Sequence, residues 1–279
     1  METGRPSRTA LRSARARAVH QVADSPRVFT DPLAARIIGG LESDPAPPGA
    51  RAMPAEVRLF MALRQRVAED ALRAAGHTRQ VVVLGAGLDT FAYRNRNPAL
   101  RVFEVDHPAT QTWKRERLAE AGIEVPDTVV FCPVDFTEQT AESGLVAAGF
   151  DPHVPAFFLL LGVAPYLERN ALLDTARFVA RLPASTELVF DYNQPPSALS
   201  PRRRPARGAQ AETMARGGEP WRSYFTPPAI AAALTDAGFD GVTDIGWQDC
   251  LVRYGLDPAL PDLIGGRIAH ARTTGPERN

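Results

Sequence analysis

The chain has 279 residues, and its 32 basic and 32 acidic side chains leave no net charge. This balance excludes a general attraction to nucleic acid or to anionic membranes, and the length fits one α/β domain with additions. The longest apolar run (157–164) is too short to cross a bilayer, the two cysteines stand far apart, and the arginine-rich N-terminus lacks an apolar signal segment, so we expect a cytoplasmic protein without disulfides.

The first part of the chain carries helix patterns. A basic helix is expected over 9–20, and Asp31 followed by Pro32 marks the start of another, because an acidic cap before a proline often opens a helix. A longer helix is expected over about 54–75. We therefore predict a helical N-terminal cap over 1–79 that contributes to the ligand pocket.

Strand and helix patterns alternate from Gln80 onward. Five short apolar runs predict strands, at 80–84, 101–105, 128–134, 156–161 and 187–191. Strands that alternate with helices are typical of a parallel sheet covered by helices on both faces. We therefore predict a Rossmann-like α/β core over 80–279.

The alternation breaks after Asn193. The segment 193–218 is rich in proline, arginine, alanine and glycine, and we expect a loop or lid there. A helix over 227–237 with Thr226 as its cap, strands near 241–247 and 250–254, and a C-terminal helix complete the predicted core.

The sequence "VVVLGAGLDT" places a glycine turn directly after the first strand. In a dinucleotide-binding fingerprint a third glycine would stand where this chain has Thr90, and Asp89 would repel a pyrophosphate. Gly85 and Gly87 therefore indicate a ligand that approaches the backbone closely but carries less negative charge.

Acidic residues follow the next two strands. Glu104 and Asp106 in "FEVDHP" point to the same side of their strand, and either is placed to bind the hydroxyls of a ribose. In "VDF", Asp135 could accept a hydrogen bond from an adenine amino group, and Phe136 could cover the ring. A nucleoside site without a phosphate site describes S-adenosylmethionine.

These motifs together resemble the leucine carboxyl methyltransferase family, which belongs to the class I S-adenosylmethionine-dependent methyltransferases and includes polyketide carboxyl O-methyltransferases. The resemblance rests on "LGAGLDT", "FEVDHP", "VDF", "GVAPYL" and "GEPWRSYF", and it extends from about residue 9 to 239. It implies a seven-stranded sheet with a helical N-terminal cap, with S-adenosylmethionine as cofactor and S-adenosylhomocysteine as product.

The resemblance also implies roles for individual residues. Gly85 and Gly87 match the donor-binding glycines, Asp106 the acid on the ribose, and Asp135 and Phe136 the adenine contacts. Arg64 and Arg17 match basic residues that hold the donor's carboxylate, for which the planar fork of arginine is suited. One position departs from the family: Leu161 stands where a glutamate contacts the donor near its amino group.

We expect methyl transfer to a carboxylate of a small natural product, polyketide-like or peptide-like, with Tyr166 and Tyr224 orienting this acceptor. A carboxylate nucleophile needs no metal and no base, and the scattered histidines predict no metal site. Methylation of a hydroxyl, with His107 or His153 as the base, is an alternative. Another is a protein that has kept the fold but serves as a non-transferring cyclase or binding module. We expect no nucleic-acid or membrane partner, and a monomer or homodimer.

Overall fold

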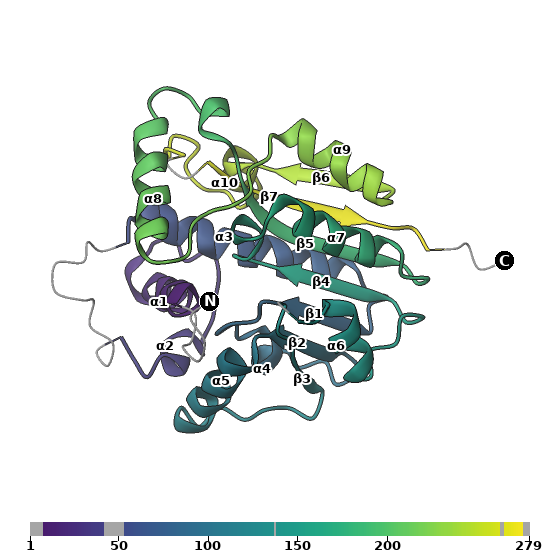
Figure 1. Ribbon diagram of the computed structural model, residues 1–279. Helices are drawn as coiled ribbons and strands as arrows, with labels where there is room; N and C mark the ends of the chain where they lie inside the picture. Colours follow the sequence, from purple (N-terminus) through teal and green to yellow (C-terminus); the bar gives the residue numbers. More distant parts are fainter. Residues whose placement is uncertain (1–7, 42–52, 137, 263–264, 276–279) are drawn as a thin grey trace.

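The structure is a computed structural model that describes residues 8–41, 53–136, 138–262 and 265–275. Its centre is one seven-stranded sheet in the order β3-β2-β1-β4-β5-β7-β6 (Figure 1). The strands are β1 (Gln80–Leu84), β2 (Arg101–Asp106), β3 (Val129–Pro133), β4 (Ala156–Leu160), β5 (Thr186–Asn193), β6 (Gly241–Ile245) and β7 (Gly266–Arg272). The predicted seven-stranded α/β sheet is confirmed.

Strands β1 to β5 are all parallel, whereas β7 runs antiparallel between β5 and β6. The chain moves outward from β1 to β3 and then crosses to β4 on the other side of β1. The carboxyl ends of β1 and β4 thus meet where the strand order reverses, which is where open α/β sheets bind their ligands.

Helices cover both faces of the sheet. Apolar side chains of β1, β2 and β4 alternate between two core clusters. One face packs against α3 (Ala55–Ala74), α4 (Phe91–Arg94) and α10 (Trp247–Arg253). The other packs against α6 (Ala141–Ala147), α7 (Arg169–Ala180) and α9 (Pro227–Ala237). Every residue of β1 and β4 is buried, which explains why all of them except Gln80 are apolar.

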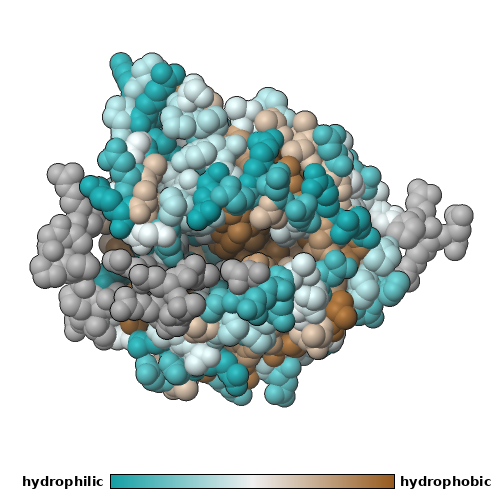
Figure 2. Space-filling view, viewed as in Figure 1, coloured by the Kyte–Doolittle hydropathy of each residue, from teal (hydrophilic) through white to brown (hydrophobic). Residues whose placement is uncertain are grey.

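A third, smaller core joins the N-terminal helices to the sheet. Apolar residues of α1 (Arg8–Ala23) and α2 (Ala34–Ile37) pack with Leu88 beyond β1 and with Leu118 of α5 (Pro108–Glu120). In Figure 1, α1 lies beside the ends of the parallel strands, and α8 (Arg204–Arg216) stands next to it. Figure 2 shows a hydrophobic hollow near the middle of the same face.

The C-terminal third differs from the prediction in three places. The segment 193–218 was expected to be a loop, but it contains the 13-residue helix α8 as well as the short η2 (Pro196–Ala198). The predicted strand at 250–254 is wrong: residues 250–253 belong to α10 and Tyr254 is its C-cap. This helix buries Trp247, Cys250 and Leu251 at helical spacing. The predicted C-terminal helix is also wrong, because that segment forms β7 and fills the gap between β5 and β6.

The helix expected to begin at Asp31 and Pro32 begins later, because α2 starts at Ala34 with Leu33 as its N-cap. The other helix predictions agree closely with the structure. Thr226 caps α9 as expected, its hydroxyl accepting a hydrogen bond from the backbone N–H of Ala229. His107 caps α5 in the same way through Nδ1. Within the residues that the structure describes, no helix combines the length and apolarity needed to cross a membrane.

Candidate active site

The glycine turn after β1 requires its glycines. Gly85 and Gly87 have φ values of +66° and +44°, a region that other residues rarely adopt. A Cβ atom on Gly85 would lie 2.4 Å from Cγ2 of Val163, so the turn also approaches the segment after β4 too closely for a side chain. Asp89 does not project freely, because it accepts a hydrogen bond from the backbone N–H of Phe91 at the start of α4.

Asp106 is joined directly to this turn. One carboxylate oxygen accepts a hydrogen bond from the backbone N–H of Gly87 at 2.6 Å, and the other accepts one from the N–H of His107 at 2.7 Å. Burial, which leaves 9% of the residue exposed, raises the pKa of Asp106, while these backbone donors oppose the shift. Each oxygen retains an acceptor position. The acid is thus held beside the glycine turn and can still accept further hydrogen bonds.

Glu104 has a different environment. Its carboxylate lies 2.8 Å from Nζ of Lys114 and accepts a 2.8 Å hydrogen bond from the hydroxyl of Tyr93. Only 1% of the residue is exposed. Burial raises the pKa of Glu104, and the contact with Lys114 lowers it. Glu104 therefore belongs to a buried ion pair, and of the two acids in "FEVDHP" only Asp106 lies at the glycine turn.

Asp135 and Phe136 follow β3, at the carboxyl ends of the parallel strands. The backbone N–H of Val134 donates to the carbonyl of Asp106, which fixes the end of β3 against the end of β2. Asp135 lies 3.5 Å from Nε2 of His107, and 54% of Phe136 is exposed. The order β3-β2-β1 thus places the end of β3 on one side of the end of β2 and the glycine turn on the other.

Arg17 and Arg64 are both buried. Arg17 donates to the carbonyl of Leu88 at 2.6 Å, and its Nε lies 3.4 Å from Asp31 but has no hydrogen-bond partner among the described residues. Arg64 on α3 pairs with Asp191 at 2.8 Å. The first arginine is therefore attached to the glycine turn and the second to the end of β5.

Asp191 is a candidate site residue that the sequence did not single out. Its second oxygen accepts a 2.5 Å hydrogen bond from the backbone N–H of Gly162, directly after Leu161. The side chain of Leu161 is partly buried and packs against the core. A buried carboxylate therefore stands next to the position where the family has its glutamate. The sequence does place Asp191 at the end of the fifth predicted strand, and an acid in that position could have indicated a site residue.

A cavity of about 90 Å³ adjoins these residues. Arg64, Gly162 and Asp191 form one side of it, and the remaining lining comes from α1, α3, α8, Tyr166, Asn193 and Trp221. Tyr166 lies at the cavity with its hydroxyl 3.6 Å from Sδ of Met214, and burial raises its pKa. Tyr224 is not part of the lining.

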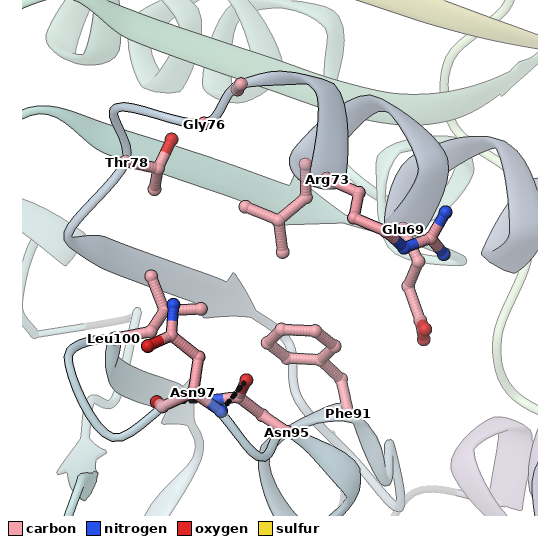
Figure 3. A pocket seen from close by; sticks show the side chains of 10 residues that line it. Glu69, Arg73, Gly76, Thr78, Phe91, Asn95, Asn97 and Leu100 are labelled. Atoms are coloured by element: carbon pink, nitrogen blue, oxygen red, sulfur yellow. Dashed lines mark hydrogen bonds between the residues drawn. The ribbon is translucent and has the colours of Figure 1, made fainter.

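A larger cavity, of about 240 Å³, lies elsewhere (Figure 3). It is bordered by the end of α3, by Phe91 and Asn95 near α4, and by Thr78 and Leu100, which precede β1 and β2. These last two residues lie at the amino ends of the strands. None of the residues lining this cavity also lines the smaller one, so it is remote from the site at the carboxyl ends.

The fold and this site define a class of protein. A seven-stranded sheet with β7 reversed, a glycine turn after β1 and an acid after β2 are the arrangement of class I methyltransferases. The sequence model of one family, leucine carboxyl methyltransferase, matches residues 10–180. The chain belongs to the leucine carboxyl methyltransferase family.

Individual relatives agree with this assignment. The chain is 37% identical over 164 residues to YktD of Bacillus subtilis, provisionally named an S-adenosyl-L-methionine-dependent methyltransferase; the match covers 57% of this chain and 53%, about half, of that relative. A protein of Frankia alni with the same provisional name is 30% identical over 301 aligned positions, covering 97% of this chain and 92% of its own. A solved structure from Thermobifida fusca, described provisionally as a methyltransferase, superposes with a TM-score of 0.60 at 19% identity and covers 98% of this chain and 96% of its own, which shows the shared fold.

Proposed function

We propose that the chain is an S-adenosylmethionine-dependent methyltransferase that transfers the methyl group to a carboxylate oxygen of a small acceptor. The observation that carries the proposal is the hydrogen bond between Gly87 and Asp106. It fixes an acid with remaining acceptor capacity beside a turn whose backbone a ligand can approach. This arrangement suits the ribose of an adenosine that bears no phosphate.

The residues around this bond fit the rest of the donor. Asp135 and Phe136 would contact the adenine, and Arg17 and Arg64 would bind the methionine carboxylate. Arg17 is attached to the residue after the glycine turn through the carbonyl of Leu88, which supports a place for it beside the donor. We assign the donor's ammonium group to Asp191, which supplies the negative charge that Leu161 cannot.

S-adenosylmethionine, when bound, supplies an electrophilic methyl group and leaves as S-adenosylhomocysteine. The protein's own contribution is to align the acceptor oxygen and to exclude water, and alignment alone can lower a barrier by roughly 7–11 kcal/mol. In this account Tyr166 helps to orient the acceptor in the 90 Å³ cavity. Tyr224 would act from outside the lining.

The choice of a carboxylate over a hydroxyl follows from the histidines. Among the described residues, none that lines the small cavity is a histidine. His107 caps α5 beside Asp135. His153 is exposed just before β4, at the amino ends of the strands. A hydroxyl acceptor would need a base within hydrogen-bond reach, whereas a carboxylate is already charged at neutral pH. The acceptor class of small natural products and a cytoplasmic location belong to the same proposal.

The test is a methyl-transfer assay with labelled S-adenosylmethionine and a panel of carboxylic acids and phenols. Transfer to an acid gives a methyl ester, which releases labelled methanol in mild alkali, whereas a methyl ether is stable. We expect alkali-labile label only. Alkali-stable label on the phenols would show that the acceptor is a hydroxyl and not a carboxylate. Failure to bind the donor would refute the methyltransferase proposal.

A further inference from the structure

Helix α8 places an arginine inside the protein with at least three of its five N–H donors unused. Arg207 is 2% exposed, and its Nε and Nη2 have no hydrogen-bond partner among the described residues. Its Nη1 donates to Gln210 at 3.2 Å, and the guanidinium lies 4.0 Å from the ring centroid of Trp221. The guanidinium plane is thus fixed by two neighbours, while one edge of it has no acceptor.

This unused edge has a specific geometry. Nε and Nη2 are the two nitrogens whose N–H groups point the same way along one side of the guanidinium, and they form the side-on fork that binds both oxygens of a carboxylate. An unpaired buried charge is costly, so folding alone does not explain an arginine here. Burial lowers the pKa of Arg207 to about 10, which still leaves it charged at neutral pH.

A second buried donor lies at the same cavity. Asn193, at the end of β5, is 6% exposed, and its Nδ2 has no hydrogen-bond partner among the described residues. Both Arg207 and Asn193 line the 90 Å³ cavity that also reaches Arg64 and Asp191. Two elements that are separate in sequence thus contribute residues with unsatisfied buried donors to the lining of one cavity.

The rest of the cavity wall suits an apolar molecule. Val57, Phe60, Met61, Met214 and Trp221 contribute hydrophobic surface. Among the described lining residues the one acid is Asp191, which is paired with Arg64. Asp262 and Asp191 act on Arg207 only through space, because neither forms an ion pair or hydrogen bond with it among the described residues. The cavity is therefore apolar with positive charge and hydrogen-bond donors at defined points.

We infer that Arg207 and Asn193 bind the carboxylate of the methyl acceptor, which is a small monocarboxylic acid with an apolar body. Nε and Nη2 of Arg207 donate to its two oxygens, and Nδ2 of Asn193 donates to one of them. The inference rests on the proposed function, because it names the acceptor of that same site. In this account Arg207 is a binding residue that sets which acceptors enter.

The test measures equilibrium binding of a series of acids to the protein saturated with S-adenosylhomocysteine. The probes are the straight-chain acids from butyrate to octanoate, together with phenylacetate, each paired with its uncharged primary amide. We expect at least one acid to bind at least tenfold more tightly than its amide. In Arg207→Gln this preference should vanish through loss of acid affinity, and Arg207→Lys, which keeps the charge without the fork, should lie between.

Arg216→Gln is the matched control, because it removes the same charge from an exposed position on the same helix. It should leave acid affinity unchanged. Because the free protein carries Arg207 unpaired, Arg207→Gln should melt no lower than the wild type, whereas an arginine that only supported the fold would lower the melting temperature. Asn193→Ala should lower the affinity for the acid severalfold and change the affinity for the amide much less.

Three results would overturn the inference: equal affinity for acids and amides, unchanged acid affinity in Arg207→Gln, or no binding of any acid in the series. S-adenosylhomocysteine binding is measured first and separately. If S-adenosylhomocysteine does not bind, the proposed function is refuted. The acid series can then be measured on the protein alone and still reports on Arg207. Binding of S-adenosylhomocysteine together with any of the three results would refute only the assignment of the acceptor.

Discussion

Replacing Asp106 by alanine is the variant that tests the proposed donor site in most detail. The carboxylate now accepts one backbone hydrogen bond on each oxygen, from Gly87 and from His107, and would accept two more from a ribose. A hydrogen bond to a charged group contributes about 1.5–3 kcal/mol. Loss of a single such bond therefore predicts roughly a 10- to 150-fold weaker complex with S-adenosylhomocysteine.

The same change also leaves two backbone N–H groups without their acceptor, so a lower melting temperature is expected. We would therefore measure affinity by calorimetry at a temperature where both proteins are folded, with circular dichroism as the check. Comparing adenosine with 2′-deoxyadenosine isolates the ribose: the wild type should prefer adenosine, and Asp106→Ala should prefer neither.

Glu104→Gln is the matched control two residues away. It removes a carboxylate from the same strand, but one that already pairs with Lys114 and Tyr93. We expect it to change stability and leave the affinity for S-adenosylhomocysteine within about twofold of the wild type. Near-normal affinity in Asp106→Ala together with a large loss in Glu104→Gln would refute the assignment of the ribose to Asp106.

Three further variants test other parts of the account. Lys114→Met should destabilise the fold by about 3–5 kcal/mol because it leaves a buried Glu104 unpaired. In chemical denaturation, adding Glu104→Gln should recover part of that loss. Additive losses of stability in the double variant would contradict the buried pair. Gly85→Ala should cost about 1–2 kcal/mol from its positive φ plus about 1–3 kcal/mol from the clash with Val163, and Val163→Ala should relieve only the second part; no relief in thermal unfolding would count against the contact. Asp191→Asn should weaken the binding of S-adenosylhomocysteine at least tenfold, but not the binding of 5′-methylthioadenosine, which lacks the amino-acid end. Equal loss of affinity for both compounds in calorimetry would refute the contact between Asp191 and the donor's ammonium group.

The centre of the parallel half of the sheet could be predicted from the sequence because β1 and β4 are buried on both faces. The runs 81–84 and 156–160 are apolar throughout and are bounded by turn residues or helix patterns. The antiparallel β7 gave no such signal. "GRIAHAR" has mixed polarity, and only its pairing with β5 and β6 makes it a strand.

The site divides in the same way. Gly85, Gly87 and Asp106 lie within or directly after adjacent strands, so their proximity follows from the order of the sheet. The roles of Arg207 and Asn193 depend on long-range packing, because the composition of 193–218 indicated only a loop and concealed α8. The pairing of Glu104 with Lys114 likewise required the path of α5 over the sheet, which the sequence did not give.

The central claim is that this chain binds S-adenosylmethionine at the glycine turn. Calorimetric titration of the purified protein with S-adenosylmethionine and with S-adenosylhomocysteine tests it most directly. We expect saturable binding of each at one molecule per chain, and competition between the two. Absence of binding by either compound to protein shown to be folded would contradict it.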